Sequence, residues 1–161
     1  MSSFQLVALD HEQFEQLFEL SDAELANRGI VRQLADSNWG FPCRVSLEDA
    51  DVGDELLLLH HQHHAVSSPY RASGPIYVGR GKQKKVLAPG VLPDCVTRRI
   101  NSVRAYNLDH MMLAADVSEG SSVAALLDQL FMDPAVAYAH LHNAKQGCFS
   151  CVANRVSNNA S

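Results

Sequence analysis

The segment ELLLLHHQHH, residues 55–64, constrains the fold more than any other part of this chain. Side chains alternate between the two faces of a β-strand, so four leucines in a row make both faces apolar. Such a strand is expected at the centre of a sheet that is covered on both sides. Its second half turns polar abruptly. Alternation sends His60 and His64 to one side. It sends His61 and His63 to the other.

The rest of the hydrophobic pattern predicts short strands mixed with helices. In the segment 121–132 apolar residues recur at helical spacing, and Asp133 followed by Pro134 ends the helix. An antiparallel pair and a hairpin are predicted further on, and shorter elements precede them. The predicted strands are 4–9, 43–47, 55–64, 76–78, the pair 102–106 with 111–117, and the hairpin 136–142 with 148–155; helices are predicted after Asp10, after Ser21 and at 93–100, and irregular chain at 66–75. We therefore expect an α+β fold with a mostly antiparallel sheet flanked by two or three helices.

The length and composition suit one globular domain. A chain of 161 residues that is 47% hydrophobic and 19% charged is large enough and apolar enough to form its own core. We predict a single α+β domain at residues 1–156. The last residues, 157–161, read SNNAS and are predicted to be a disordered C-terminal tail.

The charge balance limits the choice of partners. Thirteen basic and eighteen acidic residues give a net charge of −5, which opposes nonspecific attraction to nucleic acid. The first residues lack the basic and apolar regions of a secretory signal, and no stretch approaches the roughly 20 apolar residues that cross a bilayer. We therefore expect a cytoplasmic protein with no nucleic-acid or membrane partner. In that compartment its four cysteines should stay reduced.

The segment YAHLHNAKQGC, residues 138–148, carries the most chemically versatile side chains of the predicted hairpin. In a strand Tyr138, His140 and His142 share one face, while the alternate residues face the core. The two imidazoles would lie roughly 7 Å apart, so that their nitrogens can share one metal ion. A metal centre needs a third and usually a fourth ligand, for which the histidines of 60–64 are candidates. A solvated or structural role for these histidines is the alternative.

Cys148 follows the turn of this hairpin and lies across it from His142. An imidazole at that position favours the thiolate, which is the nucleophilic form of cysteine. A cysteine that packs as a small hydrophobic residue is the alternative. Cys151 is three residues further along the strand, so its sulfur is expected on the opposite face and the two cysteines do not form a redox pair.

Three arginines are candidates to bind an anion. Arg71 follows Tyr70 in a loop framed by two prolines, and loops of this kind on a rigid sheet often carry binding groups. Arg104 and Tyr106 share one face of a predicted strand, and Arg44 lies in another. A guanidinium that faces inward needs either an acidic residue of the protein or a bound anion as its partner.

These candidates together predict one polar pocket at an edge of the sheet, where arginines hold an anionic small molecule that the protein binds or transforms. We expect His142 to be the general acid or base, because an imidazole titrates near neutral pH. No metal ligand is assigned. A metal-dependent enzyme that uses His140 and His142 is one alternative, and a non-catalytic protein-interaction module is another. The predicted catalytic residues are His142, Cys148 and His140, and the predicted ligand-binding residues are Tyr70, Arg71, Arg104, Tyr106, Asn143 and Arg44.

Four segments carry a resemblance to a known family. FPCRVSLEDA, SPYRASGPIYV, SVRAYN and AYAHLHNAKQGC, in this order and spacing, resemble the bacterial family described as domain of unknown function 1203. The resemblance covers residues 4–156 and implies that one small domain occupies the whole chain. It implies no activity, cofactor or catalytic residue, so no role is carried over to any position. The run at 60–64 is richer in histidine than the corresponding segment of the family.

Overall fold

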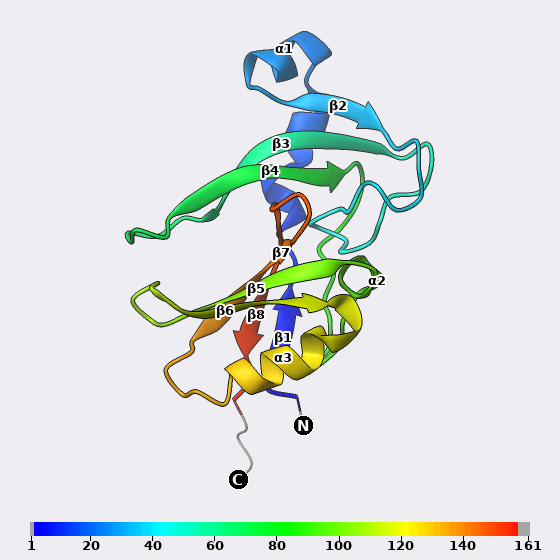
Figure 1. Cartoon of the computed structure of the whole chain (residues 1–161). Coiled ribbons are helices and arrows are strands. Elements are labelled where there is room, and N and C mark those ends of the chain that lie inside the picture. The colour runs from blue at the N-terminus through cyan, green and yellow to red at the C-terminus, as the bar shows by residue number, and fades with distance from the viewer. Residues whose placement is uncertain (1, 158–161) are drawn as a thin grey trace.

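The structure is a computed structural model that describes residues 2–157, and it contains two antiparallel β-sheets with a few short helices. The larger sheet is ordered β1 (Phe4–Val7), β8 (Phe149–Arg155), β7 (Tyr138–Asn143), β5 (Ile100–Tyr106) and β6 (Met112–Glu119). The smaller sheet is ordered β2 (Val31–Leu34), β3 (Glu55–His64) and β4 (Ala72–Gly79). Figure 1 shows the three-stranded sheet above the five-stranded one. The predicted α+β class is confirmed, with two sheets in place of one.

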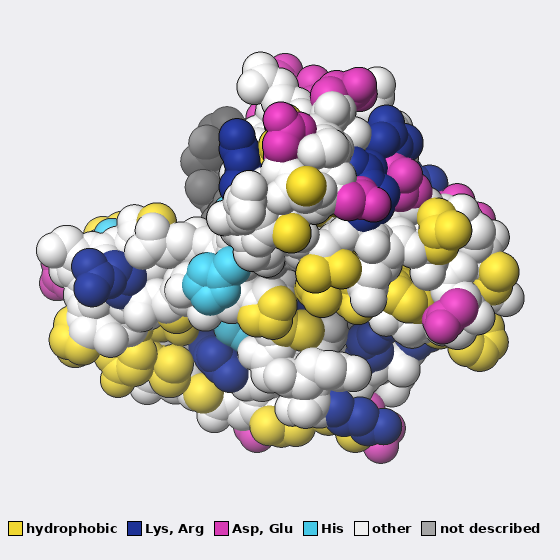
Figure 2. All heavy atoms as spheres, turned by 90° about the horizontal axis from the view of Figure 1, so that it is seen from above, with side chains coloured by type: hydrophobic (Ala, Val, Ile, Leu, Met, Phe, Trp, Pro, Cys, Tyr) yellow, Lys and Arg dark blue, Asp and Glu magenta, His cyan; other side chains and the backbone are white. Residues whose placement is uncertain are grey.

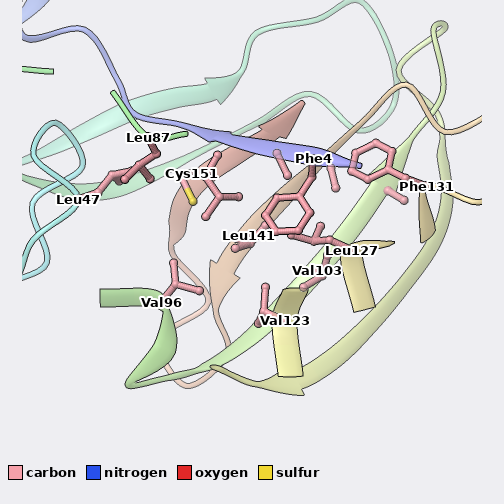
Figure 3. Packing of buried hydrophobic residues seen from close by; sticks show 14 of the residues in the cluster. Phe4, Leu47, Leu87, Val96, Val103, Val123, Leu127, Phe131, Leu141 and Cys151 are labelled. Carbon is pink, nitrogen blue, oxygen red and sulfur yellow. The ribbon is translucent and has the colours of Figure 1, made fainter. Parts of the chain in front are cut away.

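The main apolar core lies on one face of the five-stranded sheet. Ala139 and Leu141 of β7 are fully buried there, as the alternation of the predicted hairpin requires. Helix α3 (Val123–Leu130) covers this face and contributes Val123 and Leu127, and Phe4 enters from β1 (Figure 3). Burial of each large apolar side chain stabilises the fold by about 1.5–3 kcal/mol. This core joins the five-stranded sheet to helix α3.

A second apolar core lies between the three-stranded sheet and the N-terminal segment. Leu57 and Leu59 pack there against Phe14, Phe18 and Leu25. The N-terminal segment forms two 3₁₀ turns, η1 (His11–Gln13) and η2 (Glu15–Glu19), followed by helix α1 (Asp22–Asn27). The capping box predicted from Ser21 and Glu24 is present at the start of α1, and the helix predicted after Asp10 is replaced by the two 3₁₀ turns.

Strand β3 lies in the middle of the smaller sheet, as its leucine run predicts. Leu56 and Leu57 have no exposed surface and Leu59 is 5% exposed. The histidine half of the strand differs, because His60 is exposed, His61 and His63 are half-buried, and His64 is buried. A single strand thus runs from an apolar core into a polar environment.

Several predicted boundaries are wrong. Residues 43–47 form isolated bridges and a turn, because all five side chains are buried and Leu47 adopts a positive φ of 53° that ends any regular strand. Strand β4 begins at Ala72, so 72–75 is not irregular; Pro75 is tolerated because β4 is an edge strand of its sheet. Strand β2 was not predicted. The predicted helix 93–100 is the single turn α2 (Asp94–Thr97), and α3 is preceded by the 3₁₀ turn η3 (Gly120–Ser122).

The hairpin β7–β8 and the antiparallel pair β5–β6 are confirmed. The predicted tail falls largely on residues 158–161, which lie outside the described residues, and Ser157 has no regular structure. Within residues 2–157 there is no helix with the length and apolar character needed to cross a membrane.

Candidate functional site

The polar face of β7 is buried between the two sheets. Antiparallel pairing sets Arg104 opposite His140 and Tyr106 opposite Tyr138, so these side chains share one face of the larger sheet. His142 lies further along the same face. His140 is 3% exposed and His142 is 2% exposed, so neither imidazole is a solvated surface group. The sequence predicted the shared face correctly, and the structure adds its burial.

The C-terminal end of β3 covers the polar face of β7. The pairing of β3 with β4 shifts by one residue between His61 and His64, where β3 carries an extra residue in a β-bulge. Both His63 and His64 lie against β7: the ring centroid of His63 is 5.0 Å from that of His142, and the centroid of His64 is 4.8 Å from that of His140. Regular alternation had assigned these two neighbours to opposite sides.

Three imidazoles meet in a cluster that has the composition of a metal site. One ring nitrogen from each of His63, His140 and His142 lies within 4.8 Å of the other two. Ligand nitrogens bound to one zinc ion at about 2.0–2.1 Å are about 3.3 Å apart, so a small inward movement of the rings is enough to coordinate a metal. We call this set the histidine cluster. The ring of Phe149 stacks on His63 at 5.0 Å and forms an apolar wall.

The hydrogen bonds of the histidine cluster leave nitrogens free. Among the described residues, the buried Nδ1 atoms of His63 and His140 have no hydrogen-bond partner. The Nδ1 of His142 lies 3.0 Å from the carbonyl oxygen of Gly147. A carbonyl only accepts, so Nδ1–H of His142 donates, and its Nε2 accepts a long hydrogen bond from Nη1 of Arg104 at 3.4 Å. A backbone carbonyl commonly orients a metal-binding histidine in this way.

Burial keeps the histidine cluster neutral. It lowers the pKa of His140 to about 3, with His64, His142, His63 and Arg104 adding to the effect. Burial also lowers the pKa of His63 to about 4 and that of His142 to about 4, the latter with a further contribution from Arg104. Neutral imidazole is the form that binds a metal ion. It is also a poor general acid at neutral pH, so the predicted acid–base role of His142 lacks support from its environment.

Arg104 lies at the rim of the histidine cluster. Its Nη1 is 3.4 Å from Nε2 of His142, and its Nε is 3.2 Å from Oγ of Ser102. No ion pair found within residues 2–157 includes Arg104. A view from above shows histidine side chains at the surface near the middle of that face, with basic side chains beside them (Figure 2).

A chain of hydrogen bonds closes one end of the site. His64 Nδ1 lies 2.8 Å from the carbonyl of Tyr70, so Nδ1–H donates and Nε2 accepts from the hydroxyl of Tyr138 at 2.7 Å. The hydroxyl oxygen of Tyr138 then accepts from Nδ1–H of His110 at 2.8 Å. Burial raises the pKa of Tyr138 to about 12, which keeps this donor protonated. The sequence reasoning considered His64 only as one of the candidate metal ligands of 60–64, and it did not select His110.

The other predicted site residues separate from the histidine cluster. Tyr70 is 37% exposed, with its ring centroid 6.0 Å from that of Tyr106. Arg71 is exposed, and no side-chain hydrogen bond of Arg71 is found among the described residues. The structure therefore brings Arg104, Tyr106 and Tyr70 to the histidines and leaves Arg71 at the surface.

Arg44, Asn143 and Cys148 line a different hollow, of about 100 Å³. The nearest polar group to the sulfur of Cys148 is Nη2 of Arg44, at 3.1 Å, and Asn143 Nδ2 is 3.8 Å away. The imidazole of His142, predicted to be its partner, is directed to Gly147. The residues predicted to line one pocket are thus divided between the histidine cluster and this hollow.

A second group of potential metal ligands lies at the surface. Asp10, His11 and Glu12 are consecutive in the chain, and both acids are exposed. Nδ1 of His11 accepts a hydrogen bond from the backbone of Lys84 at 2.9 Å. Exposed acidic groups of this kind are common without an ion, so we assign no site to them.

A comparison with family models matches residues 40–155 to a family described as "Protein of unknown function (DUF1203)". The matched region contains all four segments on which the resemblance was based and all three members of the histidine cluster. Comparisons with curated proteins and with solved structures found no significant match.

Proposed function

The chain belongs to the DUF1203 family of proteins of unknown function, and we propose that it is a metal-dependent enzyme that acts on an anionic small molecule. The observation that carries the proposal is the histidine cluster, with three ring nitrogens within 4.8 Å of one another. Two of these rings have buried Nδ1 atoms that no other described group satisfies. Such atoms cost about 1–3 kcal/mol each when left unpaired, and a metal ion would remove part of that cost.

The donor set indicates the class of metal. Three neutral nitrogen ligands without a carboxylate favour Zn²⁺ and other transition-metal ions over Mg²⁺ and Ca²⁺, which prefer oxygen. Three protein ligands also leave a coordination position for water or substrate, as in catalytic zinc sites. A metal in such a site lowers the pKa of bound water and polarises a carbonyl or phosphoryl oxygen.

Arg104 supports the assignment of an anionic substrate. Its guanidinium lies 3.4 Å from His142 and has no acidic partner within the described part of the chain. A carboxylate or phosphate oxygen bound beside the metal would be within reach of this fixed donor. Arg104 thus orients the substrate, His63, His140 and His142 hold the ion, and Phe149 limits the access of water from one side.

Metal analysis of tag-free protein tests the proposal. After zinc supplementation and gel filtration, elemental analysis should find about one equivalent of zinc per chain, removable by a chelator. Titration of the stripped protein with Co²⁺ should give the visible absorption bands of a four-coordinate site. A cobalt spectrum without such bands, together with zinc far below one equivalent, contradicts the proposal.

The variant His63→Ala should reduce metal affinity at least about tenfold, because one of three ligands is lost. His60→Ala is the matched control: His60 lies on the same strand, is exposed, and bonds only to Oγ of Ser73 among the described side chains. Equal loss of affinity in both variants would show that the metal is held by the histidine run as a whole and not by the cluster.

A further inference from the structure

Two adjoining hollows on the far side of the β7–β8 turn form a basic site that is separate from the histidine cluster. The smaller hollow, of about 100 Å³, is lined by Arg44 and Cys148, and the larger, of about 240 Å³, by Arg98 and Lys145. Both are lined by Arg99, Asn143 and Gln146, so they adjoin one another. We call the pair the basic hollow.

Arg44 is the distinctive residue of the basic hollow because it is a buried charge. It is 2% exposed, and none of the ion pairs found in residues 2–157 includes it. Its donors reach the carbonyls of Phe149, at 2.7 Å, and of Pro42, and the third contact is the sulfur of Cys148 at 3.1 Å. Burial lowers the pKa of Arg44, and a negative charge on Cys148 counteracts that effect. A buried guanidinium requires an anionic partner, and Cys148 is the group in position to supply it.

Cys148 differs from the other three cysteines. Cys43, Cys95 and Cys151 are at most 2% exposed, whereas Cys148 is half-buried and borders the hollow. Burial raises the pKa of Cys95 to about 12 and raises that of Cys151 further, so both remain inert thiols. A thiolate that is accessible and stabilised by an adjacent cation is the reactive form of cysteine.

We propose that Cys148 is a site of covalent modification, where its sulfur, 3.1 Å from the guanidinium of Arg44, attacks small anionic electrophiles that enter the basic hollow. With an α-halo acid, a carbon–sulfur bond forms, the carbon–halogen bond breaks, and the halide leaves with the bonding electron pair. The proton of the thiol passes to solvent. Lys145 is exposed at the rim, free of the ion pairs found in the described residues, and it attracts the anionic reagent.

Paired alkylation with iodoacetate and iodoacetamide tests the proposal in the full chain, with a chelator present. Peptide mass spectrometry assigns the rate to each cysteine. The ratio of the iodoacetate rate to the iodoacetamide rate at Cys148 should exceed that of N-acetylcysteine at least about fivefold, because only iodoacetate is charged. A ratio equal to that of N-acetylcysteine would overturn the proposal.

A variant of the exposed Lys145 measures how much its positive charge contributes to the rate of alkylation. Lys145→Gln should lower the iodoacetate rate about twofold to fivefold and leave the iodoacetamide rate unchanged. Lys84→Gln, an exposed lysine outside the basic hollow, is the matched control and should change neither rate. Arg44→Gln removes the cation beside the sulfur and should lower the ratio of the iodoacetate rate to the iodoacetamide rate at Cys148, and circular dichroism checks that this buried position tolerates the change. The proposal fails if Lys145→Gln and Lys84→Gln behave alike.

This inference is independent of the metal site. His63→Ala removes a ligand of the histidine cluster and should leave the alkylation of Cys148 unchanged, because no side-chain hydrogen bond among the described residues joins Cys148 to the three histidines. Failure of metal binding and failure of selective alkylation are therefore separate results.

Discussion

The two faces of strand β7 are equally buried and chemically opposite. On one face Ala139 and Leu141 are fully buried within an apolar core that α3 closes. On the other face His140 and His142 are 3% and 2% exposed and meet further histidines. The side chains of the apolar face need close packing and no hydrogen-bond partner, and the core provides that packing. The polar face has buried Nδ1 atoms without a partner among the described residues, so burial alone does not stabilise it.

This difference indicates which face serves stability and which serves chemistry. Packing of the apolar face against other parts of the chain stabilises the folded state. Unpaired nitrogens on a buried polar face destabilise the folded state until a bound group pairs with them. Natural proteins accept such local losses mainly at functional sites. Four predictions test the contrast, from the largest expected effect to the smallest.

Truncation on the apolar face should have the largest effect. Leu141→Ala leaves a cavity in a fully packed core and should lower the free energy of unfolding by about 2–5 kcal/mol. Urea denaturation of the metal-free protein measures it. Leu108→Ala is the control, because Leu108 is 83% exposed and its truncation should cost under about 0.5 kcal/mol. Similar losses in the two variants would contradict the assignment of the stabilising core.

Acid should destabilise the metal-free protein through the polar face. The pKa values of His140 and His142 are about 3 and about 4 in the folded state and about 6.5 when unfolded. Below pH 6.5 the unfolded chain takes up protons that the folded chain does not, so stability is complete above pH 6.5 and falls toward pH 4. Between pH 7 and pH 5 the loss should be about 2–4 kcal/mol.

Urea denaturation at several pH values measures this loss. The double variant His140→Leu, His142→Leu should show a flatter pH dependence in the same window, because both titrating groups are gone. An unchanged pH dependence in that variant would show that other groups cause the acid lability.

Zinc should stabilise the protein through the same face. At a free concentration one hundred times the Kd, a ligand that binds only the folded state adds about 2.7 kcal/mol to the free energy of unfolding. Thermal denaturation at pH 7.5 with and without zinc should therefore show a higher midpoint in the wild type and in His60→Ala. The His63→Ala variant should show little shift. Equal shifts in all three proteins would locate zinc elsewhere.

Replacement of one histidine by an apolar residue should have the smallest effect and the opposite sign. His140→Leu removes a buried Nδ1 without a partner and keeps a similar side-chain volume. In the metal-free protein it should raise the free energy of unfolding by about 1 kcal/mol. The same variant should lose the stabilisation by zinc. A loss of stability without metal would mean that His140 already has a structural partner.

The elements that the sequence predicted well depend on local patterns. The leucine run of β3, the helix near Val123 and the hairpin around residues 143–147 each carry a clear period or turn signal, and each is present. Predictions failed where tertiary packing overrides the pattern. Residues 43–47 alternate as a strand does, yet all five are buried and form no ladder. Pro75 suggested irregular chain, but it lies on an edge strand, where proline is tolerated.

The candidate sites were predictable only in part. Alternation placed His140 and His142 on one face with Arg104 and Tyr106, because period-two geometry is local. The histidines of 60–64 were candidates for a third ligand, but local patterns could not select His63 among them, because its position depends on a bulge and on contact between two sheets. The pairing of Arg44 with Cys148 joins residues 104 positions apart, which no local pattern encodes.

The bulge near the end of β3 divides that strand into two parts that can change independently. Its leucine half is fixed by the cores on which the fold depends, while beyond the bulge His64 pairs with Ala72 in a register shifted by one residue. A gain or loss of one residue there would redirect the rings that approach β7 and leave the leucines in register. The direction of these rings therefore depends on the length of one strand end, while the framework that carries them depends on the leucines.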